Sequence, residues 1–135
     1  MKILIDTNVI LDVLFDREDF FQSSSAIWDI CETNNTEGYI SALSIPNIVY
    51  IMRKELDPQK TCQLIERITM IFNVASLNER DLIDAAKMYS NDYEDAVQIC
   101  QAKRINADFI ITRNIKDFKN SDVLALTPTE FLARI

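Results

Sequence analysis

The sequence predicts an α/β fold, with a parallel sheet covered by helices on both faces. Short apolar runs alternate along the 135 residues with stretches of helical periodicity, which is the pattern of strand–helix–strand units. The first run, Ile3-Leu4-Ile5, lacks polar alternation, as expected of a strand buried on both faces. No repeat, low-complexity tract or linker interrupts the chain, so a single domain over residues 1–135 is expected.

Local signals divide the first half of the chain. Residues 34–38 hold two asparagines and the single glycine, which favours a loop. Ser44 fits the N-cap of a helix with Pro46 in its first turn, and Asp57-Pro58 fits a cap followed by proline at the first helical position. The expected elements are a strand at 3–6, helices at 8–15 and 20–33, a strand at 39–42, and helices at 44–54 and from 57 onward.

The second half repeats the alternation. Asn78 is expected to cap one helix, and Thr127-Pro128-Thr129-Glu130 has the form of a capping box with proline at the first helical position. The expected elements are a strand at 72–75, a helix from 78, a helix at 92–105, strands at 108–112 and within 122–126, and a last helix from 127.

Composition excludes several kinds of active site. The chain has no histidine, which removes Ser-His-Asp and Cys-His catalysis and histidine-bound zinc. It has one glycine, whereas a Walker loop or a Rossmann fingerprint needs several to bring backbone close to phosphate. Three scattered cysteines, without a CxxC pair, fit small buried side chains better than a disulfide framework.

Charge and hydropathy set the expected surroundings. The net charge of −7 weakens a nucleic-acid interpretation without excluding one, because an acidic total can conceal a local basic rim. No apolar run approaches the length of about 18 residues that a membrane span needs. The start of the chain lacks the layout of a secretory signal, so the cytoplasm is the expected location.

Acidic residues recur where this fold would gather them. Strands one and four are neighbours in the common doubly wound orders, so their carboxyl ends, where ligands bind, would lie side by side. Carboxylates crowded there repel one another, and a divalent cation bound by oxygen, Mg²⁺ or Mn²⁺, relieves that repulsion. The acids concerned are Asp6 at the end of strand one, Asp92, Glu94 and Asp95 at the start of a helix, and Asp117 beyond strand four.

Each acid also has a structural explanation of its own. Asp6 would cap the next helix, and Asp92 with its acidic neighbours would complement a helix dipole. Asp117 would be an exposed loop acid. Asp95 adds weight to a functional interpretation because it lies about one turn before Ile99, at the edge of an apolar helix face. Only the combination favours a site.

Three segments resemble PIN-domain ribonucleases, in the order and spacing of that family and over nearly the whole chain. They are residues 3–10 (ILIDTNVI), residues 94–97 (EDAV) followed by 107–114 (ADFIITRN), and residues 127–132 (TPTEFL). The resemblance implies a three-layer α/β/α sandwich around a five-stranded parallel sheet. It also implies Mg²⁺- or Mn²⁺-dependent cleavage of RNA, homodimers and, as in many small prokaryotic members, a toxin paired with an antitoxin.

The resemblance transfers to this chain residue by residue. Asp6 matches the first acid of the family and Asp95 the third, whereas Asn47 stands at the second acidic position. The fourth position is Asn114, with Asp117 three residues on. Polar positions that support the site in the family match Asn8, Ser44 and Thr112.

The two asparagines weaken the expected metal site. An amide oxygen is a poorer ligand for Mg²⁺ than a carboxylate, so we expect one firmly bound ion at most and weakened or lost activity. That ion would be held by Asp6, Asp95 and Asp117, with Glu94 or Asp92 supplying missing charge. Arg113, Lys116 and Lys119 are candidates to hold flanking phosphates, Arg53 and Lys54 are further ones, and solvated surface charge is the alternative for all of them.

Two other functions remain to be compared with a nuclease. A non-catalytic nucleic-acid-binding or scaffold module of the same fold is favoured by the missing second acid. A phosphoacceptor signalling domain would need an acid at the end of strand three and a lysine after strand five. Here those positions are Ala75-Ser76-Leu77 and Leu126-Thr127-Pro128, so both requirements fail.

Overall fold

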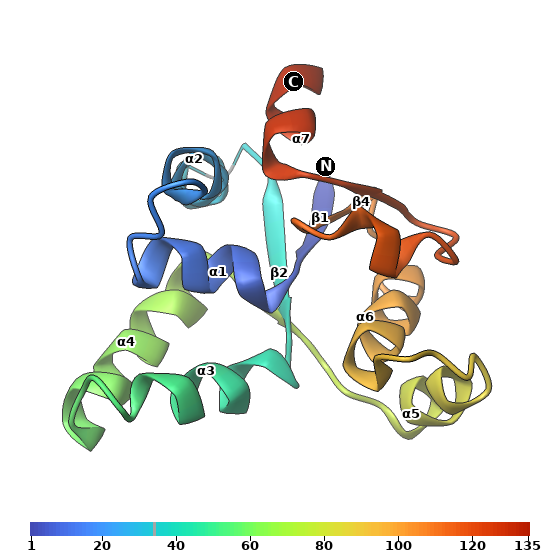
Figure 1. The fold of residues 1–135 in the computed structure, drawn as a ribbon, viewed down its shortest axis with the longest axis horizontal. Helices are drawn as coiled ribbons and strands as arrows, with labels where there is room; N and C mark the ends of the chain where they lie inside the picture. Colours follow the sequence, from blue (N-terminus) through green and yellow to red (C-terminus); the bar gives the residue numbers. More distant parts are fainter. Residues whose placement is uncertain (34) are drawn as a thin grey trace.

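A computed structural model describes residues 1–33 and 35–135, so residue 34 of the expected loop lies outside the described residues. In that described part, five strands form one parallel sheet in the order β3-β2-β1-β4-β5 (Figure 1). The predicted fold class is confirmed. The strands are β1 (Lys2–Ile5), β2 (Glu37–Ser41), β3 (Asn73–Ala75), β4 (Phe109–Ile111) and β5 (Leu124–Leu126).

Helices form a layer on each side of the sheet (Figure 1). Successive side chains of β1 point to opposite faces, so Ile3 and Ile5 pack in one core cluster and Leu4 packs in the other. One layer holds α1 (Thr7–Leu14), α2 (Phe21–Glu32), α3 (Ser44–Met52), α4 (Pro58–Ile71) and α7 (Pro128–Arg134). The other layer holds α5 (Glu79–Ala86), α6 (Tyr93–Arg104) and the 3₁₀ helix η1 (Ile115–Phe118).

The register of β1 decides which residues meet at the carboxyl edge of the sheet. Ile5 pairs with Ile111 of β4 on one side and with Ile40 of β2 on the other. The predicted adjacency of strands one and four is therefore confirmed. Asp6 and Thr112, the residues that follow the paired isoleucines, come to lie side by side, and the Asp6 N–H donates to the Ile111 carbonyl at 2.9 Å.

Most predicted helix caps are confirmed, and one is wrong. Asp57 accepts a hydrogen bond from the Lys60 N–H at 2.8 Å, and Thr127 forms its capping box. Ser44 is not a cap, because α3 already begins at that residue and its N-cap is Leu43. The Ser44 hydroxyl instead accepts a hydrogen bond from Thr7, 2.6 Å away, so a tertiary contact replaces the local one.

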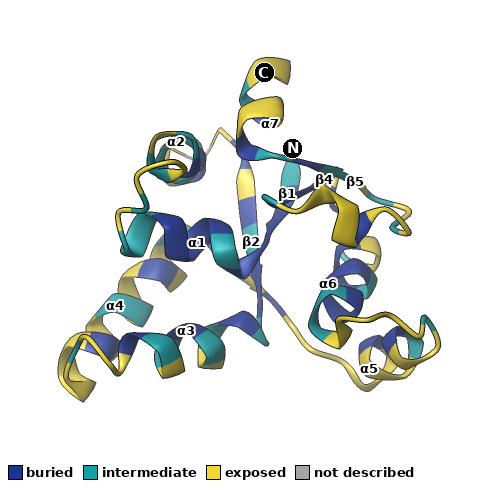
Figure 2. Ribbon diagram, viewed as in Figure 1, coloured by how far each residue is buried: buried dark blue, intermediate teal, exposed yellow. Residues whose placement is uncertain are grey.

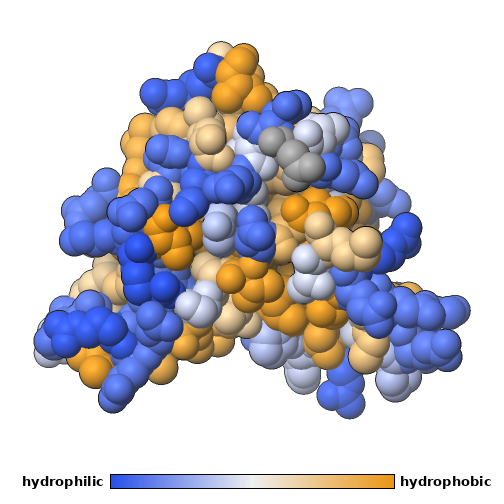
Figure 3. Space-filling model, turned by 180° about the vertical axis from the view of Figure 1, so that it is seen from behind, coloured by the Kyte–Doolittle hydropathy of each residue, from blue (hydrophilic) through white to orange (hydrophobic). Residues whose placement is uncertain are grey.

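Burial follows the layers, with dark blue along most of β1 and on the inward helix faces in Figure 2, whereas the edge strands β3 and β5 begin with exposed residues. Some large side chains stay exposed, among them Tyr50, Met70 and Tyr89. The face turned away in Figure 1 likewise shows apolar patches among hydrophilic groups (Figure 3). Among the described residues, no helix combines the length and apolarity that crossing a membrane requires.

Candidate active site at the carboxyl edge of the sheet

Asp6 is a buried carboxylate held by side chains from two other elements. Its Oδ2 accepts a hydrogen bond from Thr112 Oγ1 at 2.9 Å, and its Oδ1 accepts one from Gln98 Nε2 at 3.2 Å. Asp6 stands at the N-cap position of α1, but its side chain makes no capping bond, so capping does not explain the carboxylate. Burial raises the pKa of Asp6 above its ordinary value, and the two hydrogen bonds offset part of that rise.

The first turn of α6 brings further acids to Asp6. Asp92 caps the helix by accepting a hydrogen bond from the Asp95 N–H at 3.2 Å. Gln98 follows Asp95 by three residues and therefore shares its side of the helix, which directs its amide to Asp6. Gln98 was not among the site residues predicted from the sequence. Its polar side chain between Val97 and Ile99, on a buried helix, could have indicated a polar partner inside the protein.

Glu94 links α6 to the beginning of α3. Its Oε1 accepts a hydrogen bond from Asn47 Nδ2 at 3.0 Å and lies 3.5 Å from Thr7 Oγ1. Thr7 in turn donates to Ser44, so three elements are joined at this point. Burial raises the pKa of Glu94, and the hydrogen bond from Asn47 opposes that rise. Asn47 stands where the family has its second acid. The structure thus places the Glu94 carboxylate beside the amide at this position.

Asp95 is the most strongly perturbed of these carboxyl groups. Its pKa rises to about 7, first because of burial and then because of the negative charges of its neighbours. Those neighbours are Asp92, Asp6, Asp117 and Glu94. The acids singled out in the sequence therefore do interact, although they come from three separate segments.

Two clefts meet at Asp92 and Asp95, which line both of them. The first has a volume of about 440 Å³ and lies between α1, α3 and α6. Its lining includes Asp6, Asn8, Asn47 and Glu94. The second, of about 400 Å³, lies between the α5–α6 connection and η1, and its lining includes Lys116, Asp117 and Lys119. Asp117 is exposed there, as its loop position suggested.

The donors around these clefts suit a hard, oxygen-loving cation. In the part of the chain that the structure describes, no three His, Cys, Asp or Glu side chains gather closely enough to hold one ion as they stand. Mg²⁺ keeps several of its waters and binds proteins through one or two carboxylates, so such a triad is not required. Asp6 and Asp95, both raised in pKa and lining one cleft, fit that ligand type.

Thr112 also organises the segment that follows β4. Its hydroxyl accepts a hydrogen bond from the Asn114 N–H at 3.1 Å while donating to Asp6. The Asn114 side chain is exposed, whereas Asn8 is half-buried in the first cleft. Of the predicted supporting residues, Thr112 therefore acts on Asp6 directly, and Asn114 contributes through its backbone.

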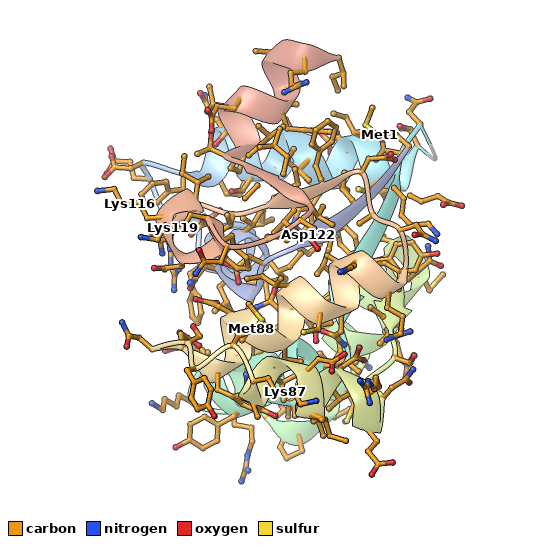
Figure 4. All side chains as sticks on the ribbon, turned by 90° about the vertical axis from the view of Figure 1, so that its right-hand side faces the viewer. Met1, Lys87, Met88, Lys116, Lys119 and Asp122 are labelled. Atoms are coloured by element: carbon orange, nitrogen blue, oxygen red, sulfur yellow. The ribbon has the colours of Figure 1, made fainter. Side chains whose placement is uncertain are left out.

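The predicted phosphate-binding cations have different surroundings. Arg113 Nε lies 3.1 Å from Asp12 Oδ2, and its guanidinium stacks 4.1 Å from the Phe20 ring centroid. Asp12 is fully buried, so the charge of Arg113 is already largely engaged. Lys116 on η1 and Lys119, the residue after it, are exposed and lie at the same edge of the molecule (Figure 4).

Comparison with known proteins extends this description. A sequence model of the PIN domain matches residues 2–116, which include the site up to the residue before Asp117. No curated protein sequence that was compared matches the chain.

Solved structures share the fold over nearly their full length. VapBC-1 from nontypeable Haemophilus influenzae aligns with a TM-score of 0.72 at 20% identity, covering 96% of this chain and 99% of that one. FitAcB from Neisseria gonorrhoeae aligns at 0.71 and 23% identity, covering 94% and 98%. A toxin–antitoxin complex from Klebsiella pneumoniae aligns at 0.69 and 20%, covering 93% and 96%.

At such identities the structures establish the common fold, and the sequence model establishes the family. The parallel five-stranded sheet, the acidic carboxyl edge and the match over residues 2–116 agree with one another. This chain belongs to the PIN-domain family.

Proposed function

We propose that this protein is a metal-dependent endoribonuclease that hydrolyses RNA phosphodiester bonds at the edge formed by Asp6, Asp95 and Asp117. Mg²⁺ or Mn²⁺ is the proposed cofactor. The observation that carries the proposal is the raised pKa of Asp95, caused by burial and by the charges of Asp92, Asp6, Asp117 and Glu94, at the wall shared by two clefts. Such crowding costs free energy in a protein without metal, and perturbed acids in a cleft are typical of functional sites.

The acids of the site would bind the metal ion, and the nearby lysines would bind RNA phosphates. Asp6 is oriented by Thr112 and Gln98, and Asp95 lies beside it in the first cleft. An ion bound there would supply positive charge to the scissile phosphate and acidify the attacking water. Lys116 and Lys119 are exposed and positioned to hold phosphates that flank the cleaved bond, through contacts independent of base identity.

Glu94 lies where it can replace the acid that is missing at position 47. The amide of Asn47 holds the Glu94 carboxylate at 3.0 Å, beside the beginning of α3. Glu94 therefore supplies the negative charge that a glutamate at position 47 would have brought. This arrangement supports activity despite the two asparagines, and it makes Glu94 part of the proposed metal environment together with Asp92.

Replacing Asp6 by asparagine tests the proposal. The change keeps the shape of the side chain but removes its charge, so Mg²⁺-dependent cleavage of an RNA pool should fall by at least about a hundredfold. Gel analysis of the products measures the loss, and EDTA should abolish cleavage by the unaltered protein. The control is Asp122→Asn, because Asp122 is an exposed acid whose partner is Lys103. Equal cleavage by all three proteins would reject the assignment.

A non-catalytic nucleic-acid-binding module remains the second candidate. The amides at positions 47 and 114, and the lack of a ready three-carboxylate cluster in the described residues, favour it. RNA binding without cleavage in either Mg²⁺ or Mn²⁺ would establish this function in place of the nuclease.

We also propose that the chain acts in the cytoplasm as the toxin of a toxin–antitoxin pair and that it forms a homodimer. The likeness to VapBC-1, to FitAcB and to a toxin–antitoxin complex supports this role. A small protein encoded beside its gene should then copurify with it and inhibit cleavage. Sedimentation of the isolated chain as a monomer would exclude the dimer.

A further inference from the structure

Tyr50 is an exposed ring at the rim of the first cleft. It lies on α3, its side chain is 66% exposed, and it lines the same cleft as Asp6, Glu94 and Asp95. The described residues provide no hydrogen bond to its hydroxyl. Tyr93, by contrast, donates its hydroxyl to the Leu82 carbonyl at 2.9 Å. Folding therefore does not account for a large aromatic side chain at position 50.

Tyr89 occupies the corresponding place at the second cleft. It lies in the connection between α5 and α6, is 92% exposed, and lines the cleft that contains Asp95, Asp117 and two lysines, Lys116 and Lys119. Its backbone φ is 49°, in the left-handed region that bulky residues avoid. Asp16 and Asn106, which follow the ends of α1 and α6, share this conformation, so it belongs to the way these helices end, and the 92% exposure of the ring is the feature that folding leaves unexplained.

The two rings lie on opposite sides of the acidic edge. Figure 1 shows α3 and the α5–α6 connection on either side of the end of β1. The clefts they line share Asp92 and Asp95 in their walls, so these acids lie between the two rings.

Positive charge accompanies both rings. Lys54 Nζ lies 5.8 Å from the centroid of Tyr50, and Lys116 and Lys119 line the cleft of Tyr89. Lysines beside exposed aromatic rings are the combination that binds single-stranded nucleic acid, since bases stack on the rings and phosphates meet the cations. In a duplex the base faces are already stacked on one another and are not available.

We propose that Tyr50 and Tyr89 are base-stacking residues that hold an unpaired RNA strand across the acidic edge, one base on each side of the bond to be cleaved. The inference rests on the proposed function for the identity of the reaction but not for the binding. It makes both tyrosines determinants of a preference for unpaired over paired RNA.

Binding and cleavage are measured separately to test this proposal. Binding uses fluorescence anisotropy of a short labelled single-stranded RNA, with Ca²⁺ in place of Mg²⁺ and a gel to check that the strand stays intact. Tyr50→Leu and Tyr89→Leu should each weaken binding about tenfold, whereas Tyr50→Phe and Tyr89→Phe, which keep the ring, should bind as the unaltered protein does. The control Tyr93→Leu removes an exposed ring outside the two clefts and should leave RNA binding unchanged, although it loses the hydrogen bond to Leu82.

Two further measurements separate stacking from charge and from misfolding. The factor lost in the leucine variants should be the same at low and high salt, because stacking, unlike phosphate contact, releases no counterions. The same RNA with abasic sites should bind weakly and equally to the unaltered protein and the leucine variants. Tyr89→Asn, which relieves the left-handed strain, should lose binding while its melting temperature stays the same or rises.

The possible failures are distinguishable. Cleavage in Mg²⁺ with binding unaffected by either leucine variant would overturn the stacking proposal and leave the nuclease intact. Ring-dependent binding without cleavage would overturn the nuclease and leave the stacking residues intact. If the leucine variants instead lose only the inhibition by a copurifying protein, the rings belong to a protein interface and the stacking proposal is overturned.

Discussion

At the scale of single residues, burial raises the pKa of both Asp6 and Asp95 in one cleft, but their neighbours differ. Asp6 receives hydrogen bonds from Thr112 and Gln98, which favour its charged form. Burial and then the negative charges of neighbouring carboxylates disfavour the charged form of Asp95 and raise its pKa to about 7. Asp95 is therefore the residue whose ionisation most disturbs the metal-free protein, and a nearby cation would relieve it most.

The stability of the metal-free protein should show this perturbation. Because the pKa of Asp95 is raised to about 7 by folding, the native state holds its proton more tightly than the unfolded chain does. The free energy of unfolding should then fall as the pH rises from about 4 to about 7. Asp95→Asn cannot ionise, so this variant should be more stable than the unaltered protein at about pH 8, by roughly 1 kcal/mol after solvent screening, and equal to it near pH 4.

Chemical denaturation at several pH values in EDTA measures the difference. Asp122→Asn should not increase the free energy of unfolding at any pH, because Asp122 is paired with Lys103 and its pKa is lowered rather than raised. A stability of Asp95→Asn that is equal to that of the unaltered protein at high pH would contradict the crowding of carboxylates on which the site depends.

At the scale of elements, the residues at helix starts predicted most N-caps correctly, but they did not predict which side chains contact one another across elements. Asp57, Asn78 and Thr127 cap their helices as expected, because a cap depends on a few consecutive residues. Ser44 has the composition of a cap, but Thr7 from another element engages its hydroxyl. Gly38 is a comparable case, because its role arises where β2 meets α2 and α4 rather than from a turn.

Adding a methyl group at Gly38 should be destabilising. A Cβ at this position would lie 2.6 Å from Cys31 Sγ and 2.9 Å from Phe72 Cδ1, closer than packed atoms allow. Gly38→Ala should lower the free energy of unfolding by about 1–3 kcal/mol, as measured by urea denaturation. Cys31→Ala removes the nearer contact, so the double variant should recover part of the loss beyond the sum of the single effects. Strict additivity would argue against that contact.

At the scale of the whole molecule, the fold converts distant acids into one electrostatic unit. Asp6, Asp95 and Asp117 come from the end of β1, the first turn of α6 and η1. They interact because β1 and β4 are adjacent and α6 packs against both strands. A cation bound at this junction would contact the folded protein only, since the unfolded chain does not bring these acids together.

Divalent ions should therefore stabilise the protein. Mn²⁺ or Mg²⁺ at about a hundred times its dissociation constant should add about 2.7 kcal/mol, seen as a higher melting temperature. Asp6→Asn and Asp95→Asn should lose this increase, even though Asp95→Asn begins from a more stable metal-free state. Asp122→Asn should keep it. An equal increase in all variants would place the ion elsewhere on the surface.

The fold class and four of the helix caps could be predicted from sequence, because they depend on hydrophobic pattern and neighbouring residues, and the adjacency of β1 and β4 followed from the common strand orders of this fold class. The sequence also singled out Asp6 and Asp95. Only the tertiary structure decided that Gln98 holds Asp6, that Asn47 holds Glu94 and that Asp12 engages Arg113. The reason is physical: these pairs are far apart in the chain, and strand register and helix packing, not local propensity, determine which side chains meet.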